Sequence, residues 1–86
     1  MNQQLTYRKV YVAVTLMVTP EGDKRPLSIT FEDGRVYEID RLCERRRAHA
    51  TKVGGTGIRY TVVINNQRTY LFEDEDKLYV EAKNYN

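Results

Sequence analysis

The longest regular pattern in the chain is an alternation of apolar and other residues that runs for about a dozen positions near the N-terminus. One side of the pattern holds Val10, Val12, Val14, Leu16 and Val18, and the other holds Lys9, Tyr11, Ala13, Thr15 and Met17. A period of two in β-branched residues predicts a β-strand over residues 7–19 rather than a helix. In a chain of 86 residues a strand of this length has to bend, as the strands of small barrels do.

The same apolar run, residues 10–18, follows Arg8 and Lys9 and could be mistaken for an export signal. It is at the short end for such a signal and far below the ~20 residues of a membrane helix. Thr19-Pro20-Glu21 follows directly and offers no cleavage site of small residues, so we interpret the run as a strand. Because that run is too short to cross a membrane as a helix, we expect no membrane association. The single cysteine, Cys43, cannot form an internal disulfide, which favours a cytoplasmic protein.

Shorter segments with strand character follow, separated by turn residues. They are residues 27–31, 35–39, 58–64, 69–72 and 78–81. Asp33-Gly34 and Asn65-Asn66 predict tight hairpin turns because these residue types tolerate positive φ, and the acidic residues 73–76 predict a solvated turn. Residues 40–50 fit a solvated edge strand, a strand with a face-switching bulge, or a short helix. The lack of a helical apolar stripe favours a strand.

These segments predict one all-β domain over residues 7–82, with a frayed N-terminus at residues 1–6 and a C-terminal tail at 83–86. Several short strands joined by regularly spaced turns are typical of a barrel or a sandwich. Because a single flat sheet leaves both edges open, we expect a small, partly open antiparallel barrel of five to six strands, SH3-like or similar.

Three segments carry a resemblance to a known family. They are DGRVYEID at residues 33–40, GGTGIRY at residues 54–60 and YLF at residues 70–72. The chain resembles, over roughly residues 7–82, an uncharacterised family of short bacterial all-β proteins of unknown function. The resemblance implies a compact β domain encoded as an independent small protein, and it implies no activity and no functional residue.

The sequence assembles no catalytic or metal-binding group. His49 and Cys43 are the only histidine and cysteine, too few for a zinc site, and no signature marks Cys43 as a nucleophile. The glycines at 54, 55 and 57 lack the spacing of a phosphate-binding loop and predict a mobile connection between strands. The acidic residues 73–76 lack the spacing of a calcium loop. We therefore predict a non-catalytic protein without cofactor or metal.

Charge is distributed unevenly, although the formal net charge is only +2. Residues 41–72 carry seven basic side chains and one acidic side chain, whereas residues 1–40 and 73–86 are each net acidic. If residues 41–49 form a regular strand, Arg41, Arg45, Arg47 and His49 project to one side. Their spacing of roughly 6.6 Å is close to the phosphate repeat of an extended nucleic-acid strand. Arginine binds phosphate bidentately, and tyrosines such as Tyr60 or Tyr70 could stack on bases.

These features predict a small binding module whose basic face contacts nucleic acid or another polyanion. The residues predicted for this contact are Arg41, Arg45, Arg46, Arg47, His49, Lys52 and Arg59. Two other interpretations stay open. The arginines can be solvated charges that protect an edge strand from aggregation, or the opposed charge blocks can serve protein interaction, with an acidic partner or in a weak homodimer.

Overall fold

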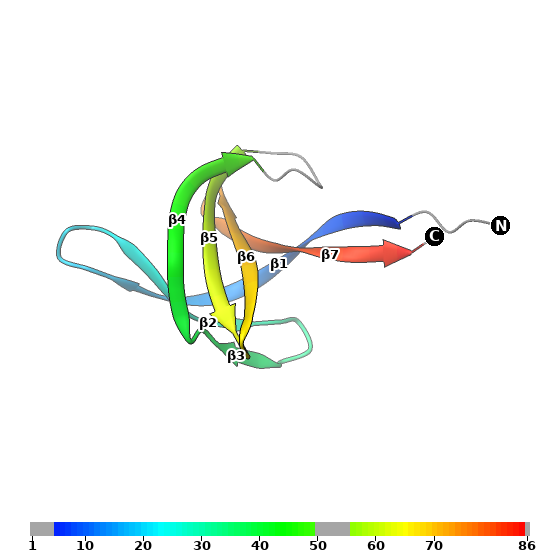
Figure 1. The fold of residues 1–86 in the computed structure, drawn as a ribbon, viewed down its shortest axis with the longest axis horizontal. Helices are drawn as coiled ribbons and strands as arrows, with labels where there is room; N and C mark the ends of the chain where they lie inside the picture. The colour runs from blue at the N-terminus through cyan, green and yellow to red at the C-terminus, as the bar shows by residue number, and fades with distance from the viewer. Residues whose placement is uncertain (1–4, 50–55, 86) are drawn as a thin grey trace.

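The computed structural model describes residues 5–49 and 56–85, and every regular element in these ranges is a β-strand. The strands are β1 (Leu5–Val18), β2 (Lys24–Thr30), β3 (Val36–Glu38), β4 (Arg41–His49), β5 (Thr56–Ile64), β6 (Gln67–Asp74) and β7 (Lys77–Tyr85). They form one antiparallel sheet in the order β3-β2-β1-β7-β6-β5-β4, which curls into an open half-barrel (Figure 1). The all-β prediction is confirmed, but the strands number seven rather than five to six.

The two edge strands of this sheet, β3 and β4, are consecutive in the chain. The Ile39 N–H donates to the Leu27 carbonyl oxygen of β2 at 2.9 Å, and the next N–H, of Asp40, donates to the Val63 carbonyl oxygen of β5 at 2.8 Å. Within one residue the chain leaves β2 and joins β5. This step draws the two edges of the sheet together, and it is the reason that β3 and β4 are separate strands at opposite edges.

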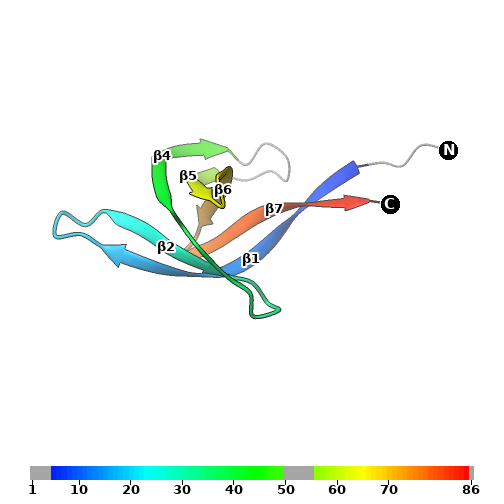
Figure 2. The ribbon, with the colours of Figure 1, turned by 60° about the horizontal axis from the view of Figure 1, so that its bottom comes forward.

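Strand β1 pairs with a different partner along each half of its length. Residues 5–12 pair with β7, and residues 13–18 pair with β2, with a register shift after Thr15. The predicted long strand is confirmed. It starts at Leu5, opposite Tyr85 of β7, so Leu5 and Thr6 of the predicted frayed N-terminus pair with residues of the predicted C-terminal tail. The paired ends form a two-stranded arm that extends away from the half-barrel (Figures 1 and 2).

Two kinds of hairpin turn connect the strands. Asn65-Asn66 and Glu75-Asp76 have positive φ at both central positions, as two-residue hairpin turns require. At Asp33-Gly34 only Gly34 has positive φ, 88°, and its N–H donates to the carbonyl oxygen of Phe31. The hairpin predicted there is confirmed, but it is a three-residue loop ending in a glycine, a common hairpin connection.

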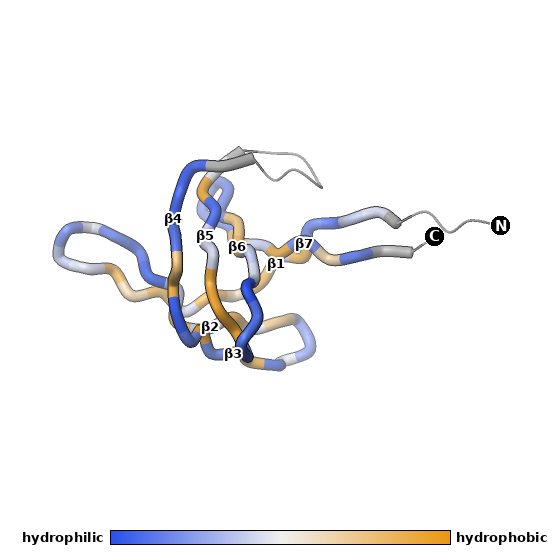
Figure 3. Tube along the Cα trace, viewed as in Figure 1, coloured by the Kyte–Doolittle hydropathy of each residue, from blue (hydrophilic) through white to orange (hydrophobic). Residues whose placement is uncertain are grey.

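The main core lies inside the curl of the sheet. Its fully buried side chains are Ile29, Tyr60, Val62 and Leu71, surrounded by partly buried Val12, Val14, Phe31, Ile39, Leu42, Ile58, Ile64, Leu78 and Val80. We call the side of the sheet that faces this core the inner face. Alternate residues point the other way, to the outer face, where Phe72 and Tyr79 form a second, smaller buried cluster. In Figure 3 the hydrophobic stretches lie along β5 and where β1 and β7 run together, whereas β4 is hydrophilic over most of its length.

Candidate polyanion-binding face

A β-bulge in the edge strand β4 decides which way its arginines point. The register with β5 shifts between Leu42 and Glu44, so Cys43 is the extra residue. A bulge of one residue moves every later side chain to the opposite face. Of the three forms considered for residues 40–50, the structure therefore shows an edge strand with a face-switching bulge. The prediction of one common side is wrong for Arg41, which lies on the opposite face from Arg45 and Arg47.

The outer face of β4, β5 and β6 collects four arginines. Arg46 of β4 lies directly opposite Arg59 of β5, and Arg41 lies in one cross-strand row with Arg68 of β6. Over residues 41–46, 59–63 and 68–72 this face carries one acidic side chain, Glu44. The fold thus brings together three of the predicted residues and adds Arg68, which the sequence analysis did not select. We call these four side chains the arginine cluster.

Arg59 is the most firmly held member of the cluster. Its guanidinium lies 4.6 Å from the centroid of the Tyr70 ring, and its Nη2 lies 3.5 Å from Glu44 Oε1. Its Nε is buried and has no hydrogen-bond partner in the part of the chain that the structure describes. Arg46 is exposed directly opposite, and like charges in directly opposed positions destabilise a sheet. Glu44 forms an ion pair with Arg59, and among the described residues no ion pair holds Arg46.

Arg45 and Arg47 lie on the inner face instead, near a buried carboxylate. Glu73 is only 8% exposed, and its two oxygens accept hydrogen bonds from Lys24 Nζ at 2.7 Å and from the Tyr60 hydroxyl at 2.8 Å. The Arg45 guanidinium lies 5.8 Å from the centroid of the Tyr60 ring. This cluster connects β2 with β5 and β6 across the half-barrel, and its carboxylate neutralises part of the positive charge on the inner face.

The pKa values in this inner-face cluster show that Glu73 is held ionised. Burial acts to raise the pKa of Glu73, but hydrogen bonds from Lys24 and Tyr60 and the neighbouring positive charges lower it by more. The hydrogen bond to Glu73 raises the pKa of Lys24, and burial raises the pKa of Tyr60. The prediction of a solvated turn over residues 73–76 is therefore wrong for Glu73. The sequence did contain a signal for this, because Glu73 lies two residues after Leu71 and alternate residues of a strand share one face.

Next to the arginine cluster, the outer face carries a row of aromatic side chains that the sequence analysis missed. Arg59 lies opposite Phe72 of β6 in the strand register. Phe72 in turn lies opposite Tyr79 of β7, and Tyr79 lies opposite Tyr11 of β1. The Phe72 and Tyr79 rings stack at 5.3 Å, and the Tyr11 ring meets Tyr79 edge-on at 5.7 Å. Burial raises the pKa of Tyr79. The aromatic row lies on three strands, and together with Arg46 and Arg59 it forms a line across five strands. No single stretch of sequence displays such a line.

Charge in the aromatic part of the outer face is balanced rather than positive. Lys9 lies opposite Glu81 and Lys77 lies opposite Asp74 in the register. The two lysines also lie over rings, with Lys9 Nζ 4.8 Å from the centroid of Tyr79 and Lys77 Nζ 5.7 Å from the centroid of Tyr11. Positive charge on the outer face is therefore concentrated at its β4–β6 end.

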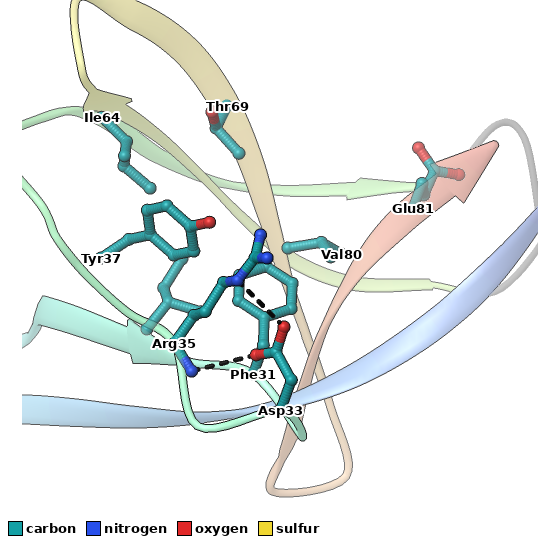
Figure 4. A pocket seen from close by; sticks show the side chains of 9 residues that line it. Phe31, Asp33, Arg35, Tyr37, Ile64, Thr69, Val80 and Glu81 are labelled. Carbon is teal, nitrogen blue, oxygen red and sulfur yellow. Dashed lines mark hydrogen bonds and ion pairs between the residues drawn. The ribbon is translucent and has the colours of Figure 1, made fainter.

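A pocket of about 430 Å³ opens on the inner side of the sheet (Figure 4). Phe31 and Tyr37, whose rings meet edge-on at 5.5 Å, line it together with residues of β5, β6 and β7. Arg35 Nε lies 3.2 Å from Asp33 Oδ2, an ion pair that is exposed to solvent. The lining is therefore mainly apolar, with the exposed Asp33–Arg35 ion pair and Glu81 as its charged groups. It has no excess of positive charge comparable to that of the arginine cluster.

The remaining predicted residues lie at the end of β4 or beyond it. His49 is the last residue of β4 and pairs with Thr56 in the register, while Lys52 and the glycines at 54 and 55 lie outside the described residues. Gly57 belongs to β5 rather than to the predicted loop. A side chain there would overlap the main-chain oxygen of Glu73, so close packing of β5 on β6 requires glycine at this position.

Within the described ranges, the structure holds no group of three or more His, Cys, Asp or Glu side chains placed to hold a metal ion. The same ranges include no helix with the length and apolar character needed to cross a membrane. Comparison with protein-family models, with curated proteins and with solved structures gives no match for this chain. The resemblance to an uncharacterised bacterial family therefore stays a prediction, and a functional interpretation has to come from the outer face itself.

Proposed function

We propose that this chain is a small non-catalytic binding module of the bacterial cytoplasm, with an SH3-like type of half-barrel whose outer face contacts nucleic acid or another polyanion. The observation that carries the proposal is the arginine cluster. Four arginines from three adjacent strands lie on one face, and over the cross-strand rows that they span this face carries one carboxylate, Glu44. Guanidinium groups bind phosphate in a bidentate manner and stay charged at any physiological pH.

The geometry adds a reason for an anion to bind at this face. Arg46 and Arg59 are directly opposed, and Glu44 reaches only Arg59. An incoming phosphate or sulfate between the two guanidinium groups would replace their repulsion by two attractive contacts. If all four arginines contact the phosphates of a single strand, the logarithm of the binding constant should fall with the logarithm of salt with a slope of about −3.

The bulge in β4 supplies a matched control on the same strand. The double variant Arg41→Ala/Arg46→Ala removes two positive charges from the outer face, and Arg45→Ala/Arg47→Ala removes two from the inner face. Titration of heparin and of a single-stranded oligonucleotide by fluorescence anisotropy at several salt concentrations compares them. We expect the outer-face variant alone to lose affinity and salt dependence. Equal losses in both variants, or an absence of salt-dependent binding by the wild type, would overturn the proposal.

Self-association, or pairing with an acidic protein, is a second candidate, favoured by the open edge of the sheet. Strand β4 pairs with β5 and forms the end of the seven-stranded order, so its outer main-chain edge is placed to accept a further strand. Light scattering across protein concentration and salt tests self-association. A dimer that persists at micromolar concentration and is lost when Cys43 is replaced by proline would favour this candidate over polyanion binding.

A further inference from the structure

The aromatic row beside the arginine cluster narrows the class of polyanion. We propose that the outer face takes single-stranded nucleic acid, with phosphates on the arginine cluster and unpaired bases stacked on Tyr70 and Tyr11. This inference rests on the proposed polyanion-binding function and adds to it a preference for bases over sulfated or double-helical polyanions.

Exposure separates the rings of this face into supporting and accessible ones. Phe72 and Tyr79 are buried, whereas Tyr70 and Tyr11 are 47% and 49% exposed. Large rings exposed to this extent on the outer face of a small sheet are available for contact with a planar ligand. The buried pair cannot itself stack on a base, but it can fix the position of its neighbours.

Both accessible rings are held in place before any ligand binds. The edge of Tyr11 packs against Tyr79, which stacks on Phe72, and the Arg59 guanidinium lies over the ring of Tyr70. An ordered ring loses little conformational entropy when a base stacks on it, and a guanidinium plane is itself a stacking surface for a base. Arg59 therefore belongs to both parts of the site, as a phosphate contact and as a stacking partner.

The placement of the two rings fits an extended strand. Tyr70 and Tyr11 lie two strands apart on the same face and are offset by two residues along the strand direction. Tyr70 lies beyond the last residue of β6 that pairs with β7, and Tyr11 is reached from it through Phe72 and Tyr79. The two rings therefore lie at separate points of the face, which suits an extended strand rather than a compact ligand.

The charge pattern supports a single strand over a duplex or heparin. The arginine cluster concentrates positive charge on β4–β6, whereas beside the aromatic row Lys9 and Lys77 lie opposite Glu81 and Asp74. A ligand whose whole length is anionic gains nothing from the balanced half. A ligand that presents phosphates to one end and uncharged rings to the other matches both halves.

The test compares oligo-dT and oligo-U of eight nucleotides with a blunt DNA duplex and with heparin. It uses wild type, Tyr11→Ala, Tyr70→Ala, and the ring-preserving controls Tyr11→Phe and Tyr70→Phe. We expect tighter binding of the single strands than of heparin or duplex, a loss of at least about fivefold in each alanine variant, and near-wild-type binding in each phenylalanine variant. Heparin affinity should be unchanged in Tyr11→Ala, Tyr11→Phe and Tyr70→Phe, which also shows that the arginine cluster is still folded. Tyr70→Ala also removes the ring beneath Arg59, so its loss of single-strand affinity is compared with that of Tyr70→Phe.

A second measurement uses the unaltered protein. Photocrosslinking to an octamer of 5-iodouridine, mapped by mass spectrometry, should label Tyr11 or Tyr70. Crosslinks found only at Tyr37, beside the apolar pocket, would overturn the inference. Equal affinity for heparin and for single strands, lost in Arg41→Ala/Arg46→Ala but unaffected by the tyrosine variants, would overturn the base-stacking inference and leave polyanion binding in place. Absence of binding to every probe would overturn both.

Discussion

The hydroxyl group of Tyr60 is the smallest group whose removal tests the buried polar cluster of the inner face. Tyr60 is fully buried, and its hydroxyl donates at 2.8 Å to Glu73, a carboxylate that is itself 8% exposed. Tyr60→Phe keeps the ring and its packing and deletes the hydroxyl, with its donation to Glu73 and its contact with Arg45. A hydrogen bond to a charged group contributes about 1.5–3 kcal/mol, so we expect a loss of about 2 kcal/mol in the free energy of unfolding at pH 7. In a domain of this size that loss lowers Tm by roughly 8–16 °C.

The same substitution should show a defined pH dependence. The pKa of Glu73 is lowered in the folded protein, so its contribution to stability is fully present above the unfolded pKa and is lost as pH falls through the folded pKa. In Tyr60→Phe one of the hydrogen bonds that lower this pKa is gone while burial remains. The gap in stability between wild type and Tyr60→Phe should therefore be largest at neutral pH and should shrink as Glu73 becomes protonated in acid.

Urea unfolding followed by circular dichroism, at several pH values from 7 down to about 3, measures both effects. Tyr70→Phe is the matched control, because it removes a hydroxyl from an exposed ring of the outer face and should change stability by less than about 0.5 kcal/mol. A loss below about 0.5 kcal/mol for Tyr60→Phe at pH 7, or a loss of equal size in acid, would refute the assignment of this hydrogen bond as a stabilising contact to an ionised carboxylate.

Three further variants test the fold. Gly57→Ala should destabilise by more than about 2 kcal/mol in thermal unfolding, because its Cβ would overlap the main-chain oxygen of Glu73; a loss of only a few tenths would contradict that close approach. Glu75→Asn/Asp76→Gly should raise stability by about 1 kcal/mol, since both positions have positive φ, and an unchanged Tm would speak against strain in this turn. Leu71→Ala should cost about 2–5 kcal/mol in urea unfolding, and a smaller cost would place Leu71 outside the core.

Local patterns predicted the parts of the fold that depend on neighbouring residues. The alternation in residues 7–19 identified β1, and Asp33-Gly34 identified its hairpin, because side-chain direction and turn conformation are properties of short segments. The number of strands was underestimated because residues 40–50, although recognised as a segment separate from 35–39, were also compatible with a short helix. The change of partner between Ile39 and Asp40 depends on where β2 and β5 lie in space. No sequence pattern marks that step.

The candidate site was predicted only in part for a related reason. A bulge at Cys43 cannot be read from residue types, and it alone separates Arg41 from Arg45. The aromatic row was missed because Phe72 and Tyr79 face each other across one hairpin while Tyr11 comes from the first strand, and the three become neighbours only through the register of the sheet. Glu73 was misread because its acidic neighbours in sequence suggested a solvated turn, while burial is decided by its alternation with Leu71.

Two adjacent arginines of β4 provide the most direct test of whether the outer face is the polyanion-binding surface. Arg46 points to the outer face opposite Arg59, and Arg47 points to the inner face opposite Ile58, so Arg46→Ala and Arg47→Ala change charge equally on opposite sides of the sheet. The measurement is the salt dependence of binding to an eight-nucleotide single strand. Arg46→Ala should weaken binding and reduce the slope by about 0.7, while Arg47→Ala should leave both near wild type. A larger loss in Arg47→Ala than in Arg46→Ala would contradict the assignment of polyanion binding to the outer face.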